Sequence, residues 1–176
     1  MVNSNTRFKD PMNLLPFMQW LEATPGSIAI RESILVYPLI ETAHVLTLAL
    51  FLGMIALLDL RLLGVGLRGV PVSEVAGRLL PIAFTGFAIM AVSGGLLFYS
   101  GPLRAYSNIF FRVKMIMIVL AGVNALLFHI TIYRRVAVWD ADPVPPLRAK
   151  VAGFLSLLLW CGVVISGRMQ AYKWFA

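Results

Sequence analysis

The sequence carries little charge for its length. Asp, Glu, Lys and Arg make up 13% of its 176 residues, whereas soluble domains carry about 25%. Hydrophobic residues make up 60%, and the mean hydropathy is +0.85. A shortage of charge on this scale argues against an ordinary water-soluble domain and indicates a protein that lipid surrounds.

Cysteine and the motifs of common enzymes are also scarce. Cys161 is the single cysteine, which excludes an internal disulfide, and no Cys-x-x-Cys-His sequence offers covalent haem attachment. The formal charge of +7 comes without a nucleic-acid-binding motif, so we expect it to meet lipid headgroups and no nucleic acid. No nucleotide-binding loop, nucleophile–base pair or metal-hydrolase motif is present, which argues against hydrolase or transferase chemistry.

Four apolar segments approach the roughly 20 residues that a helix needs to cross a bilayer. They lie at about residues 35–58, 79–99, 109–133 and 151–172. The sequence therefore predicts an all-α fold, with a four-helix transmembrane bundle as one domain over residues 35–176.

Residues 1–34 are predicted to form an N-terminal tail with a short interfacial helix. Phe17 and Trp20 favour the headgroup level, and Pro25-Gly26 closes this apolar segment; a mobile tail is the alternative. The polar stretch Met1–Pro11 lacks the pattern of a cleaved signal peptide, so we expect the first span to act as the insertion signal.

Loop charges give an expected orientation. Seven Lys and Arg residues lie in the loops after the first and third spans, and eight lie on the opposite side. Three of those eight, Arg112, Lys114 and Arg168, lie inside or at the edge of spans. Without them, seven loop cations lie on the side of the first and third loops and five on the opposite side. By the positive-inside rule, both termini then lie on the periplasmic side of a bacterial inner membrane.

The two histidines, His44 and His129, lie inside the first and third spans. An ionisable side chain within a span needs a partner, so each is a functional-site hypothesis. By helical rise, His44 lies about 13 Å and His129 about 30 Å from the same membrane surface, which separates the rings by roughly 15–20 Å. A metal–nitrogen bond is about 2 Å, so the spacing argues against one haem iron held by both. His129, near a span end, is expected to be structural.

The polar residues around His44 predict a one-sided site. Glu41 lies three residues before His44, and we expect their shared face to turn toward the bundle interior. Ser93 lies at a similar depth. The candidate cofactor-binding residues are His44, Glu41, Lys114, Arg168, Met117, Met169, Gly94, Gly95 and, as the second histidine, His129.

Haem b or another tetrapyrrole fits these residue types. His44 is the candidate metal ligand, and Glu41 can orient its imidazole or relay a proton. The two cations, Lys114 and Arg168, can pair with an acidic group such as a haem propionate. The two methionines can supply a second axial ligand, and the paired glycines can leave room for a flat macrocycle.

The same features have structural explanations, which stay open. Glu41 and His44 can form a buried interhelical pair, and Gly94-Gly95 can serve only helix packing. The two cations can extend to the headgroups. Asp59-Leu60-Arg61, after the first span, is expected to form an interfacial salt bridge and a topology stop.

Four segments carry a resemblance to a known family. They are Pro38–His44, Leu58–Gly64, Asn124–His129, and Gly167-Arg168 with Ala171-Tyr172. With them, the chain from about Trp20 onward resembles a family of uncharacterised bacterial four-span membrane proteins with a domain of unknown function. The resemblance implies a four-helix fold and a bacterial inner membrane, and no activity. A likeness to b-type cytochrome and copper-resistance membrane proteins rests on architecture and histidines only.

Three functions follow as hypotheses. The first is a membrane redox subunit or accessory protein that binds haem through His44 and, if redox-active, transfers electrons rather than acting as a stand-alone enzyme. The second is a structural or interaction subunit that docks to other membrane subunits, or to a second copy, without its own cofactor. The third is a small metal- or ion-handling protein, for which no pair of broken helices is evident.

Overall fold

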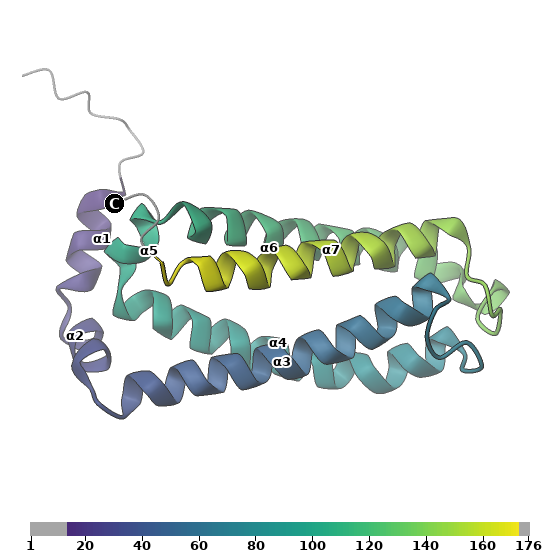
Figure 1. The fold of residues 1–176 in the computed structure, drawn as a ribbon, viewed down its shortest axis with the longest axis horizontal. Coiled ribbons are helices and arrows are strands. Elements are labelled where there is room, and N and C mark those ends of the chain that lie inside the picture. The colour runs from purple at the N-terminus through teal and green to yellow at the C-terminus, as the bar shows by residue number, and fades with distance from the viewer. Residues whose placement is uncertain (1–13, 173–176) are drawn as a thin grey trace, which may run out of the picture.

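The computed structural model describes residues 14–172 (Figure 1). Residues 1–13 of the predicted tail and residues 173–176 lie outside the described residues. The described α-helices are α1 (Leu15–Glu22), α2 (Pro25–Glu32), α3 (Val36–Leu63), α4 (Val72–Ser100), α5 (Pro102–Ser107), α6 (Ile109–Leu127) and α7 (Leu147–Met169). A π-helical turn, η1 (Phe128–Ile132), and a 3₁₀ segment, η2 (Tyr133–Val138), continue α6.

Four helices are long and apolar enough to cross a membrane. They are α3, α4, α7 and the continuous run from α6 to η2. This confirms the predicted all-α, four-helix fold, and the chain is a multi-pass membrane protein. The helices are longer than predicted: α3 continues to Leu63, and α4 already begins at Val72. The first turns of α4 are too polar to count toward a hydropathy span, yet they are helical.

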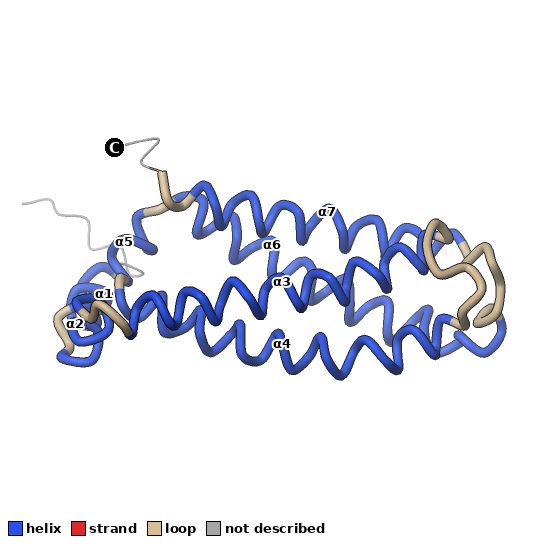
Figure 2. Tube along the Cα trace, turned by 60° about the horizontal axis from the view of Figure 1, so that its bottom comes forward, coloured by secondary structure: helices blue, strands red, loops and turns tan. Residues whose placement is uncertain are grey.

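The bundle is built from two helical hairpins, α3–α4 and α6–α7, with α3 also packed against α7 (Figures 1 and 2). We call the end with residues 64–71 and 139–146 the loop end, and the end with α1, α2 and α5 the cap end. The hairpins lie closest at the loop end (Figure 1). There, a Cβ at Gly153 would lie 3.1 Å from the carbonyl oxygen of Asp59, so only glycine permits this approach of α7 to α3.

The apolar core lies at the loop end and in the middle of the bundle. The loop-end cluster consists of Leu58, Leu62, Val72, Val75, Ala76, Trp139 and Ala149. The middle cluster joins Phe51 of α3 to Ala83 and Met90 of α4, and Trp160 of α7 packs edge-on against Phe51 at a centroid distance of 4.7 Å. Toward the cap end, polar side chains enter the bundle, and the candidate site lies there.

The cap end differs from the prediction of one short helix closed by Pro25-Gly26. Pro25 instead is the first residue of a second helix. Proline is favourable at this position because the backbone N–H that it lacks would have no hydrogen-bond partner within the helix. Thr24 caps α2 by accepting a hydrogen bond from the Ser27 amide, and its hydroxyl also lies 2.7 Å from the Tyr99 hydroxyl of α4.

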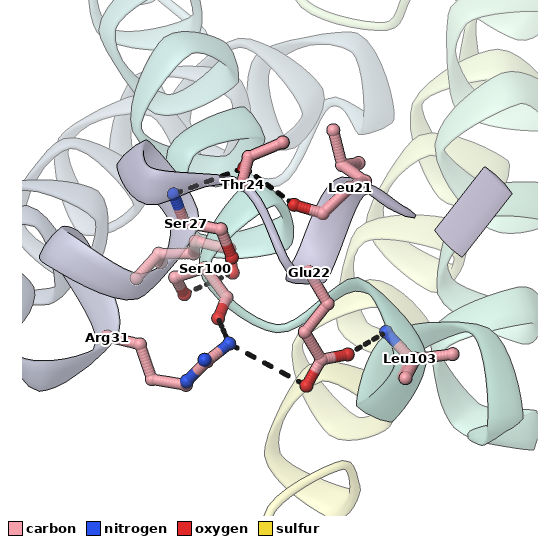
Figure 3. A network of polar contacts seen from close by, with 8 residues as sticks. Leu21, Glu22, Thr24, Ser27, Arg31, Ser100 and Leu103 are labelled. Carbon is pink, nitrogen blue, oxygen red and sulfur yellow. Dashed lines mark hydrogen bonds and ion pairs between the residues drawn. The ribbon is translucent and has the colours of Figure 1, made fainter. Parts of the chain in front are cut away.

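An ion pair between α1 and α2, together with two hydrogen bonds, connects the cap helices to the end of α4 and the start of α5 (Figure 3). Arg31 lies 3.6 Å from the Glu22 carboxylate and donates a 3.3 Å hydrogen bond to the Ser100 carbonyl. Glu22 in turn accepts a hydrogen bond from the Leu103 amide of α5, at 3.1 Å. The short α5 was not expected, because its six residues are too few to show a helical period.

Arg61 organises the loop end, and the expected salt bridge with Asp59 is wrong. Residues two apart point to different sides of a helix, so the two side chains do not meet. Arg61 is fully buried and donates to the carbonyls of Val70, Asp140 and Asp142 at 2.7, 3.2 and 3.1 Å. The Arg61 guanidinium therefore joins the two loops of the loop end by hydrogen-bonding their backbone carbonyls.

Asp140 caps α4 from a distant loop. Its carboxylate accepts hydrogen bonds from the Ser73 amide at 2.7 Å and the Ser73 hydroxyl at 2.5 Å, and its carbonyl accepts one from the Val72 amide. Burial acts to raise the pKa of the Asp140 carboxyl, but the Ser73 hydrogen bonds, together with the Arg61 charge, outweigh it and lower the pKa.

Candidate functional site

His44 of α3 is fixed in one tautomer by α4. Its Nδ1 lies 3.0 Å from the Met90 carbonyl oxygen and 3.0 Å from the Ser93 hydroxyl oxygen. A carbonyl oxygen can only accept, so Nδ1 carries the proton. In the neutral imidazole, Nε2 then holds the lone pair, and it has no hydrogen-bond partner among residues 14–172. This is the arrangement in which a histidine can bind a metal through Nε2.

Ser93 and Gly94 hold the imidazole ring against α4. Ser93 is buried, and its hydroxyl donates within α4 to the carbonyls of Ile89 at 2.8 Å or Met90 at 3.1 Å, which leaves its oxygen free to accept from His44. A Cβ at Gly94 would lie 3.0 Å from His44 Cε1. The His44 imidazole therefore occupies the space that a side chain at position 94 would need.

Lys114 of α6 brings a positive charge to the same region. Its ammonium and a protonated His44 imidazole would repel each other, which favours the neutral imidazole. The side chain crosses toward α7, where Nζ would lie 3.9 Å from a Cβ at Gly167. Within the described part of the chain, Lys114 has no ion pair or hydrogen bond. A half-buried ammonium inside a span is costly without an anion, so an acidic ligand bound there would stabilise it.

The four long helices each contribute to this group, which we call the His44–Lys114 site. It consists of His44 from α3, Ser93 and Gly94 from α4, Lys114 from α6 and Gly167 from α7. The sequence placed four of these residues at one depth. It did not predict the roles of the Met90 carbonyl, which is a backbone atom, and of Gly167, which entered only through the family resemblance.

Six of the nine candidate residues lie outside this group, and the first three of them are Glu41, Arg168 and Met117. Glu41 is exposed and forms no ion pair or hydrogen bond with residues 14–172, so the expectation that it faces the interior with His44 is wrong. Positions three apart on a helix differ by about 60° in direction, and His44 takes the direction of α4. Arg168 is exposed, and its guanidinium lies 5.8 Å from the centre of the Tyr172 ring. Met117 is committed to packing, with its sulfur against Gly162.

The remaining candidates differ in their surroundings. Gly95 faces open space, with no described atom within 4 Å of a Cβ there, whereas Gly94 is filled by His44. Met169 is the last residue of α7 and is partly buried. His129 lies in η1 toward the loop end, where its exposed ring stacks on Tyr133 at a centroid distance of 5.3 Å. The structure thus separates the two histidines.

The described residues offer no protein-only metal site. Among residues 14–172, no three His, Cys, Asp or Glu side chains come together, and Cys161 is exposed. A zinc or copper ion held by protein alone needs three or four such ligands. A metal bound at His44 Nε2 would therefore have to bring its other ligands with it.

These observations define the class of the protein. It is a multi-pass four-helix membrane protein with an imidazole and an ammonium between its helices. The chain belongs to the Family of unknown function (DUF6644), whose model matches residues 17–173. No curated protein and no solved structure matches it.

Proposed function

We propose that this protein is a membrane redox subunit or accessory protein that binds haem b, or another tetrapyrrole, through His44 Nε2. One observation carries the proposal: the Met90 carbonyl holds the proton on Nδ1, so that the lone pair on Nε2 has no partner in the described chain. A tetrapyrrole brings four nitrogen ligands of its own, so a single histidine from the protein suffices.

Lys114 supports the same ligand class. Haem carries two propionate groups at its edge, and the partnerless ammonium in the same group of residues as His44 would match an acidic ligand in charge. Lys114 lies five residues into α6 and His44 eight residues into α3. Lys114 would therefore meet an acidic group of the bound ligand closer to the cap end than His44, which would hold the metal.

A purely structural role for His44 explains only half of the geometry. The Nδ1 hydrogen bonds join α3 to α4, as interhelical polar contacts do in membrane proteins. They leave Nε2 and the Lys114 ammonium unused. A ligand whose metal is bound by His44 Nε2 and whose acidic group pairs with the Lys114 ammonium accounts for both features.

The test is the absorption spectrum of the detergent-purified full-length protein, as isolated and after addition of haemin. We expect a Soret band that His44→Ala abolishes and that the matched control His129→Ala keeps. Lys114→Met should keep the band but weaken haem binding by about tenfold, because it removes one charge-assisted contact. Wild-type protein that is colourless and takes up no haemin would refute the proposal.

The placement and partners belong to the same proposal. The chain would lie in a bacterial inner membrane with both termini in the periplasm, as the seven-against-five distribution of loop cations favours. Its electron partner would be another membrane subunit or a second copy. Periplasmic alkaline phosphatase activity from a C-terminal fusion supports this orientation, and fluorescence of a C-terminal green fluorescent protein fusion contradicts it.

A further inference from the structure

A cavity at the loop end is lined almost entirely by cationic and polar side chains. Its volume is about 620 Å³, and its lining residues are Ile130, Thr131, Arg134, Arg135 and Arg148. We call it the arginine cavity. It lies at the end of the third span, where a membrane-crossing helix meets the headgroup region.

The backbone brings the three arginines together from two elements. Thr131 lies in η1, Arg134 and Arg135 lie in η2, and all three line the same cavity. Arg148 lies in the first turn of α7, which packs against η1. The arginines of the third span and of the fourth span therefore line one cavity between them.

No carboxylate neutralises these guanidinium groups in the described chain. No acidic side chain lines the arginine cavity, and the three arginines form no ion pair or hydrogen bond with residues 14–172. Asp140, in the loop between η2 and α7, uses its carboxylate to cap α4 through Ser73. Three like charges around one cavity repel one another, so an anion there would stabilise the arrangement.

We propose that the arginine cavity binds the phosphate group of an anionic ligand, such as the headgroup of an acidic phospholipid. Guanidinium groups donate paired hydrogen bonds that match phosphate oxygens. Basic cavities between spans at the membrane surface suit acidic headgroups, and a free phosphate compound offers the same chemistry. The site is separate from the His44–Lys114 site, which lies toward the cap end.

The experiment measures binding to the purified full-length protein in dodecyl maltoside. Three probes are titrated by calorimetry: dioctanoyl phosphatidylglycerol, dioctanoyl phosphatidylcholine and inorganic phosphate. The variants are Arg134→Gln, Arg135→Gln and Arg148→Gln, alone and combined, and the matched control is Arg104→Gln, an exposed arginine at the cap end. Circular dichroism checks folding, and the single variants serve if the triple variant does not fold.

We expect phosphatidylglycerol to bind wild type and Arg104→Gln equally, and each cavity substitution to weaken binding by about tenfold or more. Tighter binding of phosphatidylglycerol than of inorganic phosphate assigns the cavity to lipid headgroups. Equal binding assigns it to a free phosphate compound. The proposal is overturned if neither anion binds, if the substitutions leave binding unchanged, or if zwitterionic phosphatidylcholine binds as tightly as phosphatidylglycerol.

Discussion

Replacing Gly94 by alanine tests how tightly the His44 imidazole is packed against α4. A Cβ at position 94 would lie 3.0 Å from His44 Cε1, closer than the ordinary contact range of 3.4–4 Å. The next residue offers a matched control, because a Cβ at Gly95 has no described atom within 4 Å. The two substitutions are chemically identical and one position apart in the same helix.

The expected difference follows from the contacts of the ring. Both alanines favour the helix over glycine by about 1 kcal/mol, so this gain cancels in the comparison. Only Gly94→Ala must displace His44, whose Nδ1 is held at 3.0 Å by both the Met90 carbonyl and the Ser93 hydroxyl. Overpacking costs typically about 1–3 kcal/mol. We therefore expect Gly94→Ala to be about 1–3 kcal/mol less stable than Gly95→Ala.

The assay is reversible unfolding in mixed micelles of increasing dodecyl sulfate content, followed by far-ultraviolet circular dichroism. The free energies of unfolding of the two variants and of wild type are compared under one set of conditions. Equal stability of the two variants, or a lower stability of Gly95→Ala, would show that the imidazole does not lie against Gly94 and would refute this geometry.

Two further predictions concern the loop end. Arg61→Met removes the donor from the partly buried carbonyls of Val70, Asp140 and Asp142. At about 1 kcal/mol for each hydrogen bond, we expect a loss of about 3 kcal/mol. A loss under 1 kcal/mol, or one matched by Arg68→Met at an exposed position, contradicts this role. The pKa of Asp140 is lowered by folding, so its stabilisation is complete above about pH 4 and is lost as the pH falls through the folded-state pKa. Asp140→Asn removes a negative charge at the N-terminus of α4, which contributes about 0.3–1 kcal/mol. We expect the variant to be less stable than wild type by this amount at pH 7 and to lack the acid-sensitive part, which unfolding at pH 7 and pH 3 measures.

The sequence was sufficient for the architecture because lipid imposes a simple rule. A stretch of about 20 apolar residues has few stable alternatives to a membrane-crossing helix. The depth of residues along each helix also follows from a constant rise. His44, Lys114 and Gly94 could therefore be placed at one level, and His129 at another, before any packing was known.

The direction of side chains around each helix could not be predicted in the same way. Glu41 and His44 differ by only about 60°, and which of them faces the bundle depends on where α4 packs. The burial of Arg61 depends on carbonyls up to 81 residues away in the sequence, and no local sequence pattern predicts these hydrogen bonds. The π-helical turn that presents Thr131 to the arginine cavity is likewise invisible to hydropathy, because a single wide turn leaves the apolar period almost unchanged.

The absorption spectrum of the purified protein tests the central claim most directly. The free Nε2 of His44 predicts a Soret band, present on isolation or gained with haemin, that disappears in His44→Ala and persists in His129→Ala. A colourless wild-type protein that binds no haemin, or a band that survives the loss of His44, would contradict the claim that this imidazole is a metal ligand.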